Sequence, residues 1–157
     1  MTGRSALVYR TLRAHPAPMG TTYEGRGARV LVVEANERAR GWDAAWLDDA
    51  GYDVTVCPGP SAPDFTCVGS RTGACPLASD VDAVVLDMSL AGDVVRTGTR
   101  AWELLMLYRQ FGMPVVVVTA PNDPFVPLPE DGVFAVRRPV ERDFLLGALR
   151  ALLRSRL

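Results

Sequence analysis

The chain contains no lysine: all 17 of its basic residues are arginine, and its one histidine is His15. The missing lysine removes any lysine-dependent chemistry. With a formal net charge of -1, the chain has no general attraction to nucleic acid or to an anionic membrane surface. No apolar run approaches the roughly 20 residues that a membrane-spanning helix needs. We therefore expect neither a nucleic-acid partner nor a membrane partner.

The beginning of the chain lacks the pattern of a secretory signal, in which a charged segment precedes an apolar run and a cleavage site. A cytoplasmic location is the default expectation. Residues 1–27 mix Pro, Gly, Arg and small polar residues, which predicts a flexible N-terminal extension, with Met19 as an alternative start to Met1. In a chain that is 48% hydrophobic, residues 28–157 suffice for one domain.

Four short apolar runs, each followed by a polar side chain, indicate the fold class. They are Val30–Val33 before Glu34, Ala83–Leu86 before Asp87, Val115–Val118 before Thr119, and Val133–Val136 before Arg137 and Arg138. Such runs are typical of parallel strands that are buried on both faces. Ligands of open α/β sheets bind outside the carboxyl ends of the strands, so we expect these ends to form one polar pocket.

Two stretches between these runs and one after the last run predict helices, at about 37–50, 100–110 and 140–154. Asn36 is a good N-cap for the first helix, and Gly51 is placed to end it. Helical spacing puts Trp42 and Trp46 on the apolar face of this helix, so both are predicted to lie in the core. The same spacing predicts that Phe144 of the last helix is buried.

Two segments interrupt the alternation of strands and helices. An alternating strand at 52–56 is followed by residues 57–77, which are dense in Pro and Gly and show no helical period. A structureless loop of roughly 20 residues indicates a function, a cross-link or a wrong assignment of elements. Residues 121–132 are rich in proline, which costs about 3 kcal/mol inside a helix, so no regular crossover helix is expected there.

The segment 57–77 holds all three cysteines of the chain, Cys57, Cys67 and Cys75. Their spacing matches no paired Cys-x-x-Cys zinc signature, and no fourth ligand is obvious. Three interpretations stay open: a metal site completed from elsewhere, one disulfide with a free thiol in a redox sensor, or simple packing.

The order of these elements, with the residues at the strand ends, resembles the receiver domain of bacterial response regulators. The resemblance covers about 28–157 and is carried by Val30–Glu34, Ala83–Met88, Pro114–Ala120 and Arg138-Pro139. It implies a five-stranded, flavodoxin-like parallel sheet of order 2-1-3-4-5, in which irregular segments replace the crossover helices after strands two and four. In that family, an aspartate that ends the third strand accepts a phosphoryl group from a partner kinase, and an acidic pair after strand one holds Mg²⁺.

Carried over position by position, the resemblance makes Asp87 the phosphoacceptor and Thr119 the switch hydroxyl. The acidic pair becomes Glu34-Ala35, so Mg²⁺ would have only Glu34 and Asp87 as carboxylate ligands and would bind weakly. Arg138 stands where the family has a lysine, and it either forks onto phosphate or forms a standing salt bridge with Asp87. Phosphoryl transfer without a well-held metal is expected to be slow.

The favoured interpretation is a stand-alone, atypical receiver-like module of two-component signalling that works largely without Mg²⁺-dependent phosphorylation. Its partner would be a protein, such as a sensor kinase, and a homodimer is compatible with it. The alternative is a redox- or metal-responsive regulator that uses Cys57, Cys67 and Cys75 on the same scaffold. An enzyme is not expected, because the strand ends offer no histidine and no nucleophile–base pair.

Overall fold

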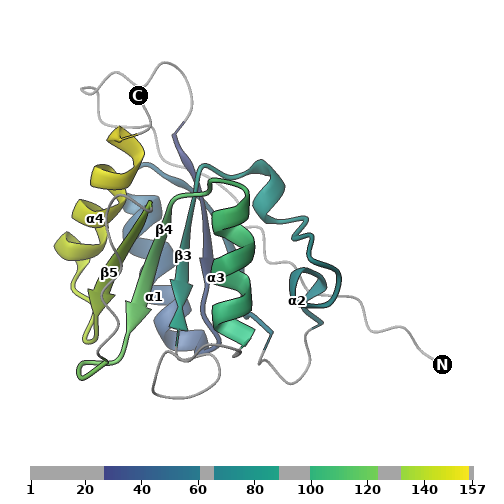
Figure 1. The fold of residues 1–157 in the computed structure, drawn as a ribbon. Helices are drawn as coiled ribbons and strands as arrows, with labels where there is room; N and C mark the ends of the chain where they lie inside the picture. Colours follow the sequence, from purple (N-terminus) through teal and green to yellow (C-terminus); the bar gives the residue numbers. More distant parts are fainter. Residues whose placement is uncertain (1–26, 61–65, 89–99, 124–131, 156–157) are drawn as a thin grey trace.

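The computed structural model describes residues 27–60, 66–88, 100–123 and 132–155. Five parallel strands form one sheet in the order β2-β1-β3-β4-β5, which confirms the predicted topology (Figure 1). The strands are β1 (Arg29–Val33), β2 (Asp53–Cys57), β3 (Ala83–Asp87), β4 (Val115–Thr119) and β5 (Val133–Arg137). The strand β1 therefore lies inside the sheet, and β2 and β5 are its edges.

Helices cover both faces of this sheet and make a three-layer domain. They are α1 (Glu37–Asp49), α2 (Val68–Thr72), α3 (Arg100–Gln110) and α4 (Arg142–Arg154). Figure 1 shows α3 in front of the sheet and α1 behind it. One apolar layer lies under α3, and the other lies between the sheet and the pair α1 and α4.

The inner strands are buried on both faces because they are built almost entirely from valine and leucine. Every residue of β3 and of β4 is buried. β-branched side chains suit the pleated backbone, and alternate residues of each strand face the two apolar layers. Polar side chains enter these strands at their carboxyl ends, where they meet the site described below.

The predicted boundaries of α1 are confirmed, and their causes are visible. The Oδ1 atom of Asn36 accepts the N–H of Ala39 at 3.0 Å, which caps the first turn. Gly51 adopts a φ of +91°, and its N–H donates to the carbonyl oxygen of Asp48 at 2.9 Å. A left-handed residue after the last turn satisfies an unpaired helix carbonyl and stops the helix.

Two predicted core positions, Trp42 and Phe144, are wrong, whereas Trp46 packs against the apolar layer between the sheet and α1. Trp42 is 54% exposed and Trp46 is only half-buried, because Asp43 and Leu47 take the inward positions of α1. Phe144 is 68% exposed, since the buried stripe of α4 begins at Leu145. In both helices the apolar stripe is rotated from the predicted one, and a large aromatic side chain is left at the surface.

The segment after β2 is more ordered than the sequence predicts. Residues 68–72 form α2, and Ala78–Asp80 form a 3-10 turn. The Sγ atom of Cys67 accepts the N–H of Ser70, and Gly73 ends the helix with a φ of +73°. The caps at its two ends thus define this short helix, whose sequence shows no helical period of apolar residues. The described part of this connection contains no full crossover helix.

Some expectations concern residues outside the described ranges. The predicted N-terminal extension, apart from its last residue, and most of the proline-rich connection fall there, at 1–26 and 124–131. In the described parts of the chain, no helix is both long and apolar enough to cross a membrane.

Candidate functional site

Four polar side chains meet at the carboxyl edge of the sheet, as predicted for the strand ends. Glu34 follows β1, Asp87 ends β3, Thr119 ends β4 and Arg138 follows β5. Parallel register places these ends at one level. The N–H of Arg138 donates to the carbonyl oxygen of Thr119 at 2.9 Å, which continues the β4–β5 ladder into the site.

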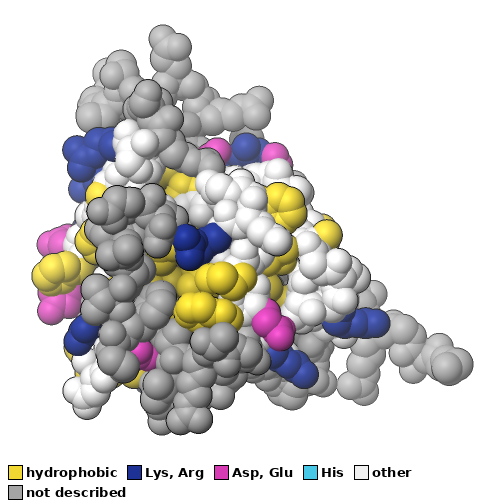
Figure 2. Space-filling view, viewed as in Figure 1, with side chains coloured by type: hydrophobic (Ala, Val, Ile, Leu, Met, Phe, Trp, Pro, Cys, Tyr) yellow, Lys and Arg dark blue, Asp and Glu magenta, His cyan; other side chains and the backbone are white. Residues whose placement is uncertain are grey.

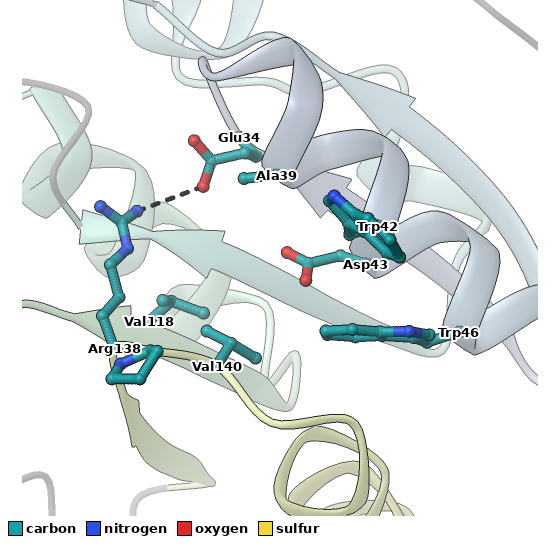
Figure 3. Close-up of a pocket in the computed structure, with 9 residues that line it drawn as sticks. Glu34, Ala39, Trp42, Asp43, Trp46, Val118, Arg138 and Val140 are labelled. Atoms are coloured by element: carbon teal, nitrogen blue, oxygen red, sulfur yellow. Dashed lines mark hydrogen bonds and ion pairs between the residues drawn. The ribbon is translucent and has the colours of Figure 1, made fainter.

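The guanidinium of Arg138 joins two of these carboxylates. Its Nη2 atom forms an ion pair with Oδ2 of Asp87. The same Nη2 atom lies 3.4 Å from Oε2 of Glu34, the contact marked in Figure 3. The side chain of Asp87 is 2% exposed and that of Arg138 is 35% exposed, so the guanidinium is the solvent-facing side of the pair. A carboxylate this deeply buried needs a partner of opposite charge.

Glu34 is also fixed by its own turn. Its Oε1 atom accepts the N–H of Asn36 at 2.8 Å, and its carbonyl oxygen accepts from Nη1 of Arg40 at 2.9 Å. Burial raises the pKa of Glu34 above its ordinary value, and the Asn36 N–H and the Arg138 charge oppose that shift. The first turn of α1 and the end of β5 therefore hold this carboxylate between them.

The hydroxyl of Thr119 lies in the site but takes no part in the contacts among the described residues. Its side chain is buried, and within the described residues its Oγ1 atom has no hydrogen-bond partner. The hydroxyl that the resemblance makes a phosphoryl sensor is thus buried and unpaired beside the ion pair.

Receiver domains are among the solved structures that are similar to this chain. A response regulator receiver domain protein from Bacillus halodurans is 18% identical over 81% of this chain and 97% of that chain, with a TM-score of 0.59. For a response regulator receiver protein from Sinorhizobium medicae, the identity is 18%, the coverage 83% and 98%, and the TM-score 0.57. A Francisella receiver domain is 16% identical over 83% and 100%, with a TM-score of 0.59.

The chain has the receiver fold. At these identities the likeness concerns the fold, and no protein-family model and no curated protein sequence matches the chain.

The residues present do not fit the Mg²⁺ site that the receiver fold implies. Ala35 supplies no carboxylate, and the positive guanidinium of Arg138 already contacts both Glu34 and Asp87. Among the described residues, no three His, Cys, Asp or Glu side chains are grouped so that they could hold a metal ion. A divalent cation at this place would meet one positive charge and too few oxygen ligands.

The three cysteines of this receiver fold lie against the apolar layer under α3. Cys57 is buried in that layer, and Cys67 and Cys75 pack against it. All three are free thiols. Burial raises the pKa of Cys57 to about 11, although the N–H of Gly59 donates to its sulfur. Cys57 is therefore a neutral thiol near pH 7 and a weak nucleophile or metal ligand.

The sequence interpretation missed Asp43 of α1. Its side chain is buried, and burial raises its pKa to about 6, against the lowering effect of the Arg138 charge. The signal was present in the sequence, because position 43 is one turn from both Ala39 and Leu47 on the face assigned to the core. An aspartate on an apolar face conflicts with the helical pattern, and such conflicts are expected at functional sites.

Asp43 lines a cleft that lies beside the ion pair of Arg138 and Asp87. The cleft has a volume of about 350 Å³ and lies between α1, the end of β4 and the segment after β5. Figure 3 shows Trp42 and Trp46 on one side of it and Val118 and Val140 on the other.

Proposed function

We propose that the chain is a receiver-fold signalling module whose site is occupied by the Arg138–Asp87 ion pair and which works largely without Mg²⁺-dependent phosphorylation. The observation that carries this proposal is the contact of one guanidinium with both buried carboxylates. In that arrangement the positive charge beside the two carboxylates comes from an arginine of the protein and not from a bound Mg²⁺ ion.

Phosphorylation of Asp87 would require this pair to separate. The attacking carboxylate oxygen would have to leave the guanidinium while its side chain stays almost wholly buried. Breaking a buried pair costs about 3–5 kcal/mol, and the partial exposure of Arg138 reduces that cost to about 2–4 kcal/mol. Without a divalent cation to neutralise the developing charge, the transfer itself is also slow.

A protein partner fits this proposal better than a substrate. The strand ends supply carboxylates, a hydroxyl and an arginine, and the described residues contain no histidine to act as a base. On the face that carries α3, Figure 2 shows hydrophobic side chains among charged ones, and the exposed residues of α3 itself are polar. A sensor kinase or another signalling protein, a cytoplasmic location and a homodimer belong to this proposal.

Acetyl phosphate and Mg²⁺, with intact-mass spectrometry as readout, test the proposal. The wild type is expected to form no phosphoryl adduct. The double variant Ala35→Asp, Arg138→Lys restores the second carboxylate and the smaller point charge, and it should form an adduct. The matched control adds Asp87→Asn to that double variant and should abolish the adduct. A wild-type adduct that needs both Mg²⁺ and Asp87 would refute the proposal.

The second candidate is a redox regulator, favoured by the packing of all three cysteines against one apolar layer. Mild oxidation with diamide should then produce a reversible disulfide among Cys57, Cys67 and Cys75 and shift the melting temperature. The variant with all three replaced by alanine should not respond. If diamide leaves the wild type reduced and its melting temperature unchanged, the redox candidate is wrong.

A further inference from the structure

The cleft between α1 and the segment after β5 is lined by the largely buried carboxylate of Asp43, to which the described residues supply no hydrogen bond and no ion pair. Asp43 is only 5% exposed. A buried carboxylate without compensation is costly, so proteins retain one mainly where something else pairs with it.

Arg138, the described cation whose charge acts on Asp43, pairs with other carboxylates. The guanidinium of Arg138 contacts Asp87 and Glu34. In Figure 3 it is turned toward Glu34, whereas the carboxylate of Asp43 leaves α1 on the side of Val118. The charge of Arg138 therefore reaches Asp43 only through space, and the carboxylate faces the cleft.

Two indole rings stand beside this carboxylate. Trp42 and Trp46 lie one turn apart on α1, with ring centroids 6.0 Å apart and planes inclined by 44°. Trp42 is 54% exposed although it is one of the largest apolar side chains of the domain. An indole face attracts a cation, and the attraction grows where water is excluded.

The chemistry of the cleft selects the charge of its occupant. Two carboxylates, Asp43 and Glu34, and one guanidinium, that of Arg138, line it. Because the guanidinium is already paired with Glu34 and Asp87, the lining is net negative when both carboxylates are ionised and disfavours an anion. A divalent metal ion does not fit either, because the described residues offer no group of three suitable ligands. A volume of about 350 Å³ is in the range of small-molecule sites, which span about 300–1,000 Å³.

We propose that this cleft binds a small organic cation, an ammonium group with an apolar body. The ammonium lies against the carboxylate of Asp43, and the apolar body lies between Trp42 and Trp46 on one side and Val118 and Val140 on the other. A second copy of the chain cannot supply this ammonium from a side chain, because the sequence has no lysine. The proposal does not depend on whether Asp87 is phosphorylated.

Choline chloride and n-butylammonium chloride are suitable probes, measured by isothermal titration calorimetry and tryptophan fluorescence at pH 8, where Asp43 is ionised. We expect millimolar or tighter binding of both. The uncharged analogue of choline, 3,3-dimethyl-1-butanol, should bind at least about tenfold more weakly, and butyrate should not bind. Equal binding of the uncharged analogue, or no binding of either cation up to roughly 10 mM, would overturn the proposal.

Variants locate the site. Asp43→Asn keeps the shape of the side chain and should weaken choline binding at least about tenfold, because it removes the negative charge that faces the quaternary ammonium. Trp42→Leu changes an exposed position and should weaken it about threefold to tenfold. The matched control is Asp48→Asn, an exposed carboxylate of the same helix, which should leave the affinity unchanged. An affinity that survives Asp43→Asn would refute the assignment.

One further outcome would also overturn the proposal. If the wild type dimerises in solution and Asp43→Asn is monomeric, the occupant is an arginine of a second copy rather than a free small molecule. Size-exclusion chromatography with light scattering distinguishes the two, and the proposal requires both proteins to have the same oligomeric state.

Discussion

Arg138 crosses over the end of β4 to reach Asp87. The two residues belong to β3 and to the connection after β5, which are not neighbours in the sheet. Their ion pair therefore ties an edge strand to the middle of the sheet at the level of the site. Because Asp87 is buried and Arg138 is not, the two partners are expected to respond differently to substitution.

Arg138→Met should lower the free energy of unfolding by about 2–4 kcal/mol, because it removes the positive charge that pairs with the buried carboxylate of Asp87. Asp87→Asn should cost less, since Arg138 keeps Glu34 and access to solvent. Urea unfolding measures both, and the double variant should cost less than the sum of the single variants. The control is Arg137→Met, at an exposed neighbouring position, with an expected change within about 0.5 kcal/mol. Additive costs would show that the pair contributes no coupling.

Asp43→Asn should stabilise the protein at high pH. Folding raises the pKa of Asp43 from 3.8 to about 6, so the folded state binds the proton more tightly and loses stability as pH rises through this interval. Above pH 6 the buried, ionised carboxylate of Asp43 lowers the stability of the wild type by about 2–3 kcal/mol. Below pH 4 this cost vanishes, because the carboxyl group is protonated in both states. Glu34 and Arg138 also face this region and are present in both proteins.

Urea unfolding of Asp43→Asn and wild type at pH 8 and at pH 4.5 checks this prediction. The stability difference in favour of Asp43→Asn should shrink markedly at the lower pH. Asp48→Asn serves as the control, with an expected effect within about 0.5 kcal/mol at both pH values. A difference that does not change with pH would contradict the raised pKa of Asp43.

Thr119→Val should be neutral or stabilising by up to about 1 kcal/mol. The substitution replaces a buried hydroxyl, unpaired within the described residues, by a methyl group of similar size. Thr119→Ala is the informative contrast, because it removes the methyl group as well and leaves a small cavity that should cost about 1 kcal/mol or more. Thermal unfolding gives both values, and a clear loss of stability in Thr119→Val would reveal a hydrogen bond of the hydroxyl.

Iodoacetamide at pH 8 should label Cys57 much more slowly than Cys67 and Cys75. Only the thiolate reacts with iodoacetamide. Cys57 is buried, and its burial raises the pKa of the thiol to about 11. Its thiolate is therefore scarce, and reagent reaches it only when the structure opens. Peptide mapping over time gives the three rates, and denatured protein, in which the rates should become similar, is the control. Fast labelling of native Cys57 would contradict its position in the core.

The sheet could be predicted from the sequence because its strands carry their own signal. Runs such as Val115–Val118 are short, apolar and β-branched, so their type and burial follow from few alternatives. The order of the strands came from the resemblance and not from the runs. The ends of these strands also predicted the site, since parallel register brings Glu34, Asp87, Thr119 and Arg138 to one edge whatever the helices do.

Helix faces and contacts were harder to predict. The spacing of Trp42 and Trp46 fits an apolar stripe, but a rotation of the helix by part of a turn puts Asp43 inside instead, and the local pattern does not fix that angle. The short helix α2 depends on a cap from the sulfur of Cys67, and such a cap leaves no periodic apolar pattern in the sequence. Whether Arg138 pairs with Asp87 depends on side-chain reach, which no pattern of residue types contains.

Glu34 and Arg138 line the cleft and also belong to the strand-end site, so the two sites have these two residues in common. Anything that draws the guanidinium away from Asp87 changes the field inside the cleft, and any occupant of the cleft changes how firmly the guanidinium is held. Thermodynamic reciprocity requires the two effects to be equal in free energy. A change at Asp87 and the binding of an occupant at Asp43 would therefore be coupled through the side chain of Arg138 alone, and no helix would have to move.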